Sequence, residues 1–581
     1  MLLKTSNSFS QVIFERRFEL ALCLIVAWAF LLRAWGATSG LPMLNVKDEG
    51  QMIPAAVRFG SGDFNPHSFT YPSLYKYLLF FLYGIYFAVG RIFGTFSSVE
   101  DFKLHYFNDP SDFYVIARVC SALLGALTVL MVYFIGKQLH SNRIGLVAAL
   151  LFSVDFQHLR YSHLAKPDVA MIFLMVTAIY FACRIATAGA LRNYIWAGVF
   201  GGLAISAKYN AVTVVIPIVV AHLLVGSERN FFLRLRNNFH YLILSLSLVG
   251  VFFFVGTPFA LFDYRTFGRD LEFVKLVVSR GDAGHDYLST VAYYFKEMFL
   301  PGSWSWQGKY AGLLILAGLL LALFRRRRQN WIILSFIIVH FFYFTYKTSS
   351  DLPKPHYLLP LLPLMFIFAA QFLEFLTARL KTAEFFKTGA LAVVVILLML
   401  APTRVAYFFN YELSRESTDE RARNWILENV PSATRILQVG RHSLALPENR
   451  QSLKENSADS PPDVLQSKIK AVTKFPGNTY YICRLDPGWN VTEEIVQTME
   501  ELPLGVKLPE SEMFNLSYWL EKEVQLVVIM GERQGVRGSF LDSVHISLLN
   551  FGQQLETEAQ LVTEFVPEEP HVPGRWIRIY E

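Results

Sequence analysis

The sequence predicts a polytopic α-helical membrane protein that carries a soluble α/β domain at its C-terminal end. Hydrophobic residues make up 53% of the 581-residue chain, and charged residues make up 17%. Soluble domains carry about 25% charged residues, so this composition is typical of a membrane protein. Apolar segments recur up to residue 403 and polar sequence follows. We therefore predict a membrane domain over residues 1–403 and an external soluble domain over residues 404–581.

Twelve segments are apolar enough to be candidates for membrane spans. They lie near residues 18–38, 74–93, 114–137, 144–158, 168–187, 193–209, 211–226, 238–257, 310–324, 331–346, 357–377 and 387–403.

Charge placement between these segments predicts about eleven crossings. Arg16 and Arg17 precede the first span and favour a cytoplasmic N-terminus. Basic connectors at 137–143, 184–192, 229–236, 325–328 and 379–387 are expected on the same side. If segment 74–93 also crossed the membrane, the following basic connectors would no longer all lie on the cytoplasmic side. Its four tyrosines suit a juxtamembrane helix in the membrane interface. An ordinary span with one misassigned connector is the alternative.

The same topology places residues 39–112 in a first external loop and the C-terminal domain outside. The tetra-arginine run at 325–328 is interpreted as a topology signal, so no nucleic-acid partner is expected. Within residues 404–581, the pattern predicts a helix beginning near Ser417 and ending before Pro431. Short strands are predicted at 436–439, 480–483, 524–529 and 576–580, and a polar loop at 449–463.

Carboxylates and cations gather at the predicted external face from turns far apart in the sequence. Charged residues near membrane depth are costly and usually mark function. Carboxylates suit deprotonation of an attacking hydroxyl, and Lys, Arg and His suit stabilisation of a departing phosphate. The candidate catalytic residues are Asp48, Glu49 and Asp168. The candidate phosphate- or substrate-binding residues are His67, Tyr71, Lys76, Arg118, His163, Lys166, Lys208 and His356.

No cofactor is expected to be required. The four cysteines offer neither a disulfide framework nor a zinc spacing. A divalent metal held by Asp48, Glu49, Asp63 and His67 is chemically feasible and is kept as an alternative.

Several local patterns resemble the GT-C glycosyltransferases of the protein O-mannosyltransferase and lipid A aminoarabinose transferase superfamily. Asp48-Glu49 resembles the acidic pair that follows the first span of the family. The segments 71–76 (YPSLYK) and 162–168 (SHLAKPD) resemble its His-Pro-Pro-Leu-Gly-Lys and Ser-Arg-x-x-x-x-Asp motifs. The arginine-led segment 118–125 and the late segment 355–360 match further motifs in the same order.

The resemblance implies a polyprenyl-phosphate-linked sugar donor and an acceptor hydroxyl on a lipid, a glycan or a protein. It makes Asp48 the expected general base in an inverting transfer. Glu49 would orient the acceptor or bind Arg118. Tyr71 and His163 depart from the basic residues of the family, which shifts the expected phosphate contact towards Lys76, Arg118 and Lys166.

Two other functions are kept open. A transporter or flippase of lipid-linked glycans would use the same cations, but such proteins usually show internal repeats and midplane sites, and no repeat is visible here. A membrane-bound assembly protein would work through its C-terminal domain. The expected location is a bacterial inner membrane, among its lipids, with the site and the C-terminal domain on the external, periplasmic side.

Overall fold

The computed structural model describes residues 2–43, 49–225, 238–279, 287–299, 311–347, 355–440, 443–456, 462–475, 477–485, 515–531, 551, 553–566 and 576–581. These residues form two compact units. Unit 1 comprises residues 1–37, 48–84 and 115–410, and unit 2 comprises residues 38–47, 85–114 and 411–581. Segments of the first loop therefore pack with the C-terminal domain, and the predicted boundary at 403/404 stays a prediction.

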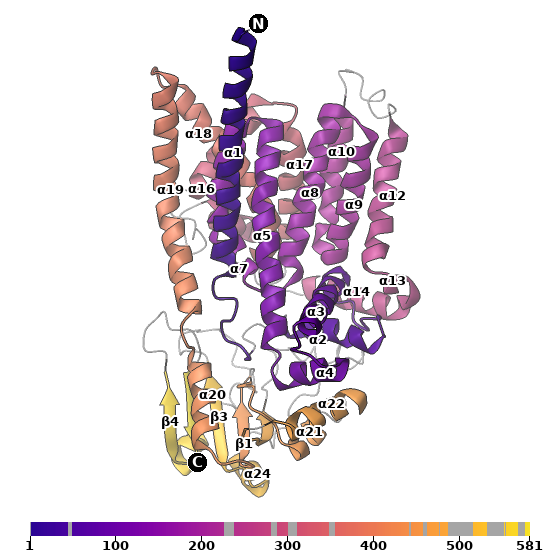
Figure 1. The fold of residues 1–581 in the computed structure, drawn as a ribbon, viewed down its shortest axis with the longest axis vertical. Coiled ribbons are helices and arrows are strands. Elements are labelled where there is room, and N and C mark those ends of the chain that lie inside the picture. Colours follow the sequence, from indigo (N-terminus) through magenta and orange to yellow (C-terminus); the bar gives the residue numbers. More distant parts are fainter. Residues whose placement is uncertain are drawn as a thin grey trace. The chain divides into compact units, whose positions relative to one another are not determined.

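Helices form the membrane part, as predicted, and every one of the twelve apolar segments contains helix (Figure 1). The elements up to residue 223 are α1 (Leu2–Ala34), α2 (Glu49–Arg58), η1 (Phe59–Ser61), α3 (Leu74–Ile92), α4 (Val99–Asn108), α5 (Ser111–Leu139), α6 (Asn142–Ser153), α7 (Phe156–Ser162), α8 (Pro167–Ala188), α9 (Leu191–Ala207), η2 (Tyr209–Val214) and α10 (Val215–Leu223). The following elements are α12 (Phe239–Gly256), α13 (Phe259–Phe262), α14 (Tyr264–Ser279), α15 (Tyr287–Phe299), α16 (Ala311–Arg325), α17 (Asn330–Lys347), η3 (Pro355–Leu361), α18 (Leu362–Ala378) and α19 (Glu384–Leu413).

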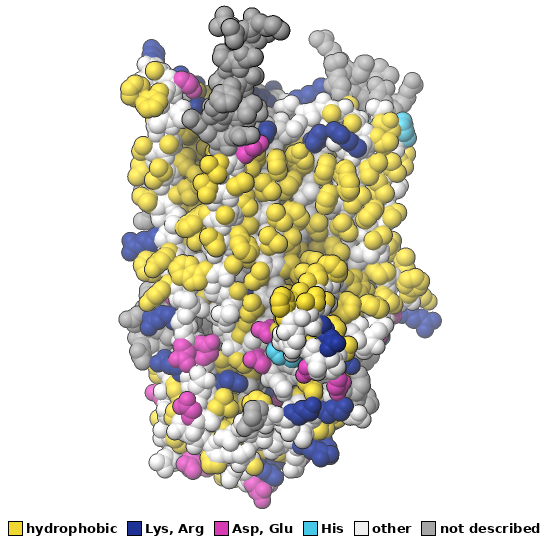
Figure 2. All heavy atoms as spheres, viewed as in Figure 1, with side chains coloured by type: hydrophobic (Ala, Val, Ile, Leu, Met, Phe, Trp, Pro, Cys, Tyr) yellow, Lys and Arg dark blue, Asp and Glu magenta, His cyan; other side chains and the backbone are white. Residues whose placement is uncertain are grey.

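Within the described residues, six helical segments are long and apolar enough to cross a membrane. They lie in α5, α8, α12, α17, η3–α18 and α19. Shorter apolar helices include α6 and α16. Figure 2 shows a hydrophobic band across the membrane helices on the face of the molecule that it presents. The chain is thus a multi-pass membrane protein, and the predicted total of about eleven crossings stays a prediction.

Glycines allow α9 and α12 to pack closely. A Cβ at Gly198 would collide with the Ser245 carbonyl of α12, and one at Gly202 with the Val249 carbonyl. The four-residue spacing puts both glycines on one face of α9, the arrangement that lets helix backbones approach in membranes. Lys208 follows α9 as its C-cap residue.

The C-terminal domain of unit 2 is a mixed α/β layer structure. Its described elements are α20 (Thr418–Asn429), β1 (Arg435–Val439), α21 (Arg450–Asn456), α22 (Pro462–Thr473), β2 (Tyr481–Leu485), α24 (Leu516–Glu521), β3 (Leu526–Gly531), β4 (Leu561–Phe565) and β5 (Trp576–Tyr580). The strand order is β2-β1-β3-β5-β4, with β1 parallel to β2 and β3, and β5 antiparallel to β3 and β4. The predicted α/β class is confirmed.

Local signals explain most of this domain. Ser417 and Glu420 form a reciprocal capping box at the start of α20, where the sequence predicts a helix start. Alternate strand residues face two separate cores: Ile436 and Ile482 lie on the α20 side, and Leu437 and Leu485 lie on the α24 side. The predicted loop at 449–463 is wrong for residues 450–456, which form α21, and for residues 462 and 463, which begin α22. Residues 457–461 lie outside the described residues.

Candidate functional site

Glu49 is a buried carboxylate that joins three parts of unit 1. Arg118 of α5 donates from Nε to Glu49 Oε1 at 3.0 Å and from Nη2 to Oε2 at 2.9 Å. The backbone N–H of Ala165 donates to Oε1 at 2.8 Å. The Glu49 and Arg118 side chains are 0% and 7% exposed, so water does not screen the pair. The expected contact between these two residues is confirmed, and it ties α2 and α5 to the turn that precedes α8.

Arg118 also uses its remaining terminal nitrogen within the protein, because Nη1 donates to the Ala37 carbonyl at 3.0 Å. The guanidinium therefore contacts protein acceptors through Nε, Nη1 and Nη2. Contact between Arg118 and a donor phosphate stays a prediction.

A second buried ion pair joins α8 to the end of α9. Lys208 Nζ donates to Asp168 Oδ1 at 2.7 Å, and the two side chains are 8% and 1% exposed. Pro167 occupies the first turn of α8 and places Asp168 in that turn, where the helix dipole favours a carboxylate. Within the part of the chain that the structure describes, Asp168 Oδ2 is buried and has no hydrogen-bond partner. This oxygen can accept a hydrogen bond from a ligand.

Three more predicted residues lie around this pair. Lys208 Nζ is 5.6 Å from the centre of the Tyr71 ring. Lys166 is the N-cap residue of α8, and its Nζ is 5.6 Å from the centre of the Tyr161 ring. That ring is also 6.1 Å from the imidazole of His356. The structure therefore connects Asp168 and Lys208 with Tyr71, and Lys166 with His356 through Tyr161.

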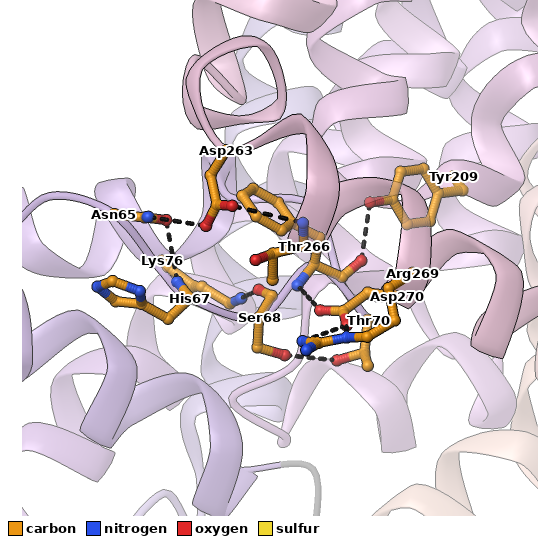
Figure 3. Close-up of polar contacts among 11 residues, drawn as sticks. Asn65, His67, Ser68, Thr70, Lys76, Tyr209, Asp263, Thr266, Arg269 and Asp270 are labelled. Atoms are coloured by element: carbon orange, nitrogen blue, oxygen red, sulfur yellow. Dashed lines mark hydrogen bonds and ion pairs between the residues drawn. The ribbon is translucent and has the colours of Figure 1, made fainter. Parts of the chain in front are cut away.

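Side chains from distant elements hold the loop that precedes α3, as Figure 3 shows. The Phe69 N–H donates to Asp270 Oδ2 of α14 at 2.7 Å, and the Tyr209 hydroxyl donates to the Phe69 carbonyl at 2.8 Å. Asn65 Nδ2 donates to Asp263 Oδ2 at 2.9 Å. Tyr209 directly follows Lys208 in the sequence, so the same turn that carries the lysine also holds the loop that carries Tyr71.

Lys76 supports this loop from inside. Its ammonium donates to the Ser68 carbonyl at 2.8 Å and to the Tyr71 carbonyl at 3.3 Å. Burial lowers the pKa of Lys76 to about 8, with repulsion from Arg58 as a further cause. The side chain is 3% exposed. Phosphate contact by Lys76 stays a prediction, while its role in holding the loop is observed.

Two of the three predicted histidines, His163 and His67, lie in different environments. His163 is buried, and its two ring nitrogens lie 2.9 Å from the Leu159 carbonyl and 3.0 Å from the Trp35 carbonyl. Burial lowers the pKa of His163, although both carbonyls favour the protonated ring. His67 is half exposed and pairs with Asp63 at 2.6 Å, and this hydrogen bond lowers the pKa of Asp63.

Asp48, the predicted general base, lies outside the described residues. Of the other groups considered for a metal, Glu49 is occupied by Arg118, and Asp63 bonds to the exposed His67. The described residues contain no group of three or more His, Cys, Asp or Glu side chains arranged to hold a metal ion.

Sequence reasoning did not single out Asp263 and Asp270. Both belong to the α13–α14 region, where no apolar span is predicted. Asp270 is buried and also accepts from Arg269 Nε and Nη2 at 3.1 and 3.0 Å. An acidic residue in an amphipathic helix is an ordinary surface pattern, so the sequence holds no signal for its contact with Phe69.

Comparisons with known proteins bear on this arrangement. Residues 111–255, from α5 to the end of α12, match the family model described as dolichyl-phosphate-mannose-protein mannosyltransferase. The structure of ArnT from Cupriavidus metallidurans in the apo state covers 96% of this chain and 97% of its own length, with 14% sequence identity and a TM-score of 0.51. The chain has a GT-C fold. The resemblance predicted from the local motifs is thereby confirmed.

Two further structures show similarity. ArnT from Cupriavidus metallidurans bound to undecaprenyl phosphate has the same coverage of 96% and 97%, 14% identity and a TM-score of 0.51. The oligosaccharyltransferase AglB from Archaeoglobus fulgidus, in complex with an inhibitory peptide and a dolichol-phosphate, covers 89% of this chain and 69% of its own, with 14% identity and a TM-score of 0.48. No curated protein sequence matches the chain. The matched family segment includes Arg118, His163, Lys166, Asp168 and Lys208 of the GT-C fold.

Proposed function

We propose that this chain is an integral membrane glycosyltransferase that moves a sugar from a polyprenyl-phosphate donor to a hydroxyl of a lipid, a glycan or a protein. One observation carries the proposal: in a chain with a GT-C fold, Asp168 and Lys208 form a buried pair beside Tyr71, and one oxygen of Asp168 has no partner among the described residues. Buried charged groups with unused bonding capacity are characteristic of functional sites in membrane proteins.

In the proposed reaction, the acceptor oxygen attacks the anomeric carbon of the donor sugar and forms the new glycosidic bond. The bond between that carbon and the phosphate oxygen breaks, and its electron pair leaves with the polyprenyl phosphate. Asp48 takes the hydroxyl proton, and the anomeric configuration inverts. Lys208 and Lys166 offset the negative charge that develops on the leaving phosphate.

The Glu49–Arg118 pair has a supporting role in this proposal. Glu49 begins α2 and follows Asp48 directly in the sequence. The three hydrogen bonds that Glu49 accepts hold the start of α2 against α5 and the Ala165 turn. A general base works only when it is held in the geometry of the reaction, so the pair would position Asp48.

The proposed setting is a bacterial inner membrane, with the site on the external face. The basic connectors predicted on the cytoplasmic side support this orientation. We further propose that no metal is required, because polyprenyl phosphate is a monophosphate leaving group that lysine side chains can stabilise. Turnover of the purified protein should therefore be unchanged in excess EDTA, and loss of turnover that Mg²⁺ or Mn²⁺ restores would refute this part.

The test is sugar transfer by the purified full chain in lipid, with a panel of radiolabelled polyprenyl-phosphate sugars and acceptors from a membrane extract. Wild type is compared with Asp48→Asn and with Asp63→Asn, a half-exposed carboxylate of the same loop. Transfer by wild type and Asp63→Asn, with loss in Asp48→Asn, supports the activity and the base. Equal transfer by all three rules out Asp48. If the folded wild type transfers no sugar from any donor, the proposed activity is rejected. The alternative, transport of lipid-linked glycans, would then be tested in a flux assay.

A further inference from the structure

Met43 belongs to the first loop of the chain, yet it lies in the core of the C-terminal domain. Its side chain is 2% exposed and packs in the apolar core on the α20 side of the sheet. The other buried members of this core are Ala422, Ile426, Val430, Ile436, Leu444, Leu446, Tyr480, Ile482, Leu526, Val528, Met530, Ile577 and Ile579. Among the described residues of this core, Met43 alone comes from outside the C-terminal segment. The domain thus uses a residue of the loop to complete its own packing.

The packing around Met43 has a regular basis. Ala422, Ile426 and Val430 recur every four residues and form one face of α20. Alternate residues of the strands form the opposing surface. A methionine fits an irregular gap between such surfaces because its side chain is unbranched and flexible. Removal of its side chain would leave a cavity that the surrounding elements fill only in part.

A second contact in unit 2 connects the same loop region to the same domain. Helix α4 packs against α22, and Lys470 Nζ lies 3.0 Å from Glu100 Oε1. Both side chains are about half exposed, at 61% and 47%, and ion pairs of this kind contribute little. The buried Met43 therefore attaches the loop more strongly than this ion pair does, and the packing of α4 on α22 is a further attachment.

The position of Met43 in the sequence gives this attachment its significance. Six positions separate it from Glu49, which the Arg118 side chain and the Ala165 N–H hold in unit 1. We infer that the C-terminal domain is a positioning element of the transferase, and that Met43 anchors one end of the segment that leads into α2. The Glu49–Arg118 pair anchors the other end. This inference rests on the proposed function, and Met43 acts as a positioning residue that does not touch substrate.

The experiment compares full-length proteins in lipid: wild type, Met43→Ala, Met43→Leu and a control, Leu437→Ala. Leu437 is buried in the α24-side core, where the described members all come from the C-terminal domain. Misplacement of reacting groups by about 1 Å can cost about 100-fold in rate. We expect Met43→Ala to lower kcat by roughly 10- to 100-fold, with the donor KM changed by less than about twofold. Met43→Leu keeps the volume and should retain a kcat near wild type.

Hydrogen exchange provides a readout that does not depend on activity. Backbone amides of residues 38–43 should exchange faster in Met43→Ala than in wild type, and at the wild-type rate in Leu437→Ala. Unchanged exchange in Met43→Ala overturns the anchor. Faster exchange with unchanged kcat overturns the positioning role, as does an equal loss of kcat in Met43→Ala and Leu437→Ala. A folded wild type that transfers no sugar counts against the proposed function, while the exchange measurement still decides the anchor.

Discussion

Substitution Glu49→Gln should strongly destabilise unit 1. The carboxylate accepts two hydrogen bonds from the Arg118 guanidinium and one from the Ala165 N–H, at 2.8–3.0 Å and without solvent exposure. Glutamine keeps one acceptor oxygen, but its NH₂ group would face the donors of Arg118. Removal of one partner from a buried ion pair costs about 3–5 kcal/mol, because the other charge is left uncompensated in a medium of low polarity. We expect a loss of this size in the free energy of unfolding.

The double variant Glu49→Met/Arg118→Leu separates the cost of the lone charge from the contribution of the pair. Each single variant should lose about 3–5 kcal/mol, whereas the double variant leaves no buried charge and should lose much less than the sum. The exposed pair of Arg143 and Glu384, with side chains 31% and 68% exposed and 3.2 Å apart, provides the matched control. Glu384→Gln should cause no measurable change, because solvent screens this pair.

The measurement is equilibrium unfolding of the purified variants in mixed micelles, with the free energy of unfolding taken from the denaturant dependence. Retention of wild-type stability to within about 1 kcal/mol in Glu49→Gln would refute the uncompensated-charge argument, which expects about 3–5 kcal/mol. Strict additivity of the two single losses in the double variant would refute the coupling between Glu49 and Arg118.

Three further predictions concern the site. Lys208→Met should lower the rate of sugar transfer by about 100- to 1,000-fold, which is the usual effect of removing one donor that stabilises the transition state, and Lys208→Arg should restore part of the rate. A wild-type rate of Lys208→Met in a steady-state assay would contradict the role of Lys208 in stabilising the leaving phosphate. Asp270→Ala leaves the Phe69 N–H unpaired, so we expect faster hydrogen exchange in residues 65–71 and a higher donor KM, and unchanged exchange would show that other contacts hold the loop. Burial lowers the pKa of His163, so on acidification the ring becomes protonated in the unfolded chain, near pH 6.5, before it does in the folded chain. The free energy of unfolding should therefore fall as the pH drops below about 6.5. Thermal unfolding at pH 7.5 and 5.5 should show a smaller pH effect in His163→Gln than in wild type, and an equal effect would exclude His163 as the cause.

Local patterns predicted most of the fold. The apolar segments of about 20 residues and the cap at Ser417 are signals formed by residues close together in the sequence. The structure contains a helix at each of them. The helix α14 was not predicted, because its amphipathic pattern lacks the apolar length of a span. Part of the predicted loop at 449–463 is helix instead, because polar composition is as compatible with a surface helix such as α21 as with a loop.

The candidate site was predictable in its residues and only partly in its contacts. The positions of Asp168 and Lys208 at helix ends could be inferred from the apolar pattern, and the structure brings the two together across 40 positions. The contact between Phe69 and Asp270 spans 201 positions and depends on the packing of α14. Pairing over such distances is a tertiary property, and no local spacing encodes it.

The contacts also divide the predicted cations into different roles. Arg118 binds the Glu49 carboxylate and the Ala37 carbonyl, and Lys76 donates to loop carbonyls, so both stabilise the protein that surrounds the site. Lys208 differs from them, because its partner Asp168 keeps a buried oxygen that no described residue satisfies. A buried acceptor without a partner costs free energy, and it persists more readily where a ligand completes it. Removal of Lys208 also leaves Asp168 as a lone buried charge, so its loss should lower both transfer and stability, while loss of Arg118 or Lys76 should be visible first in stability.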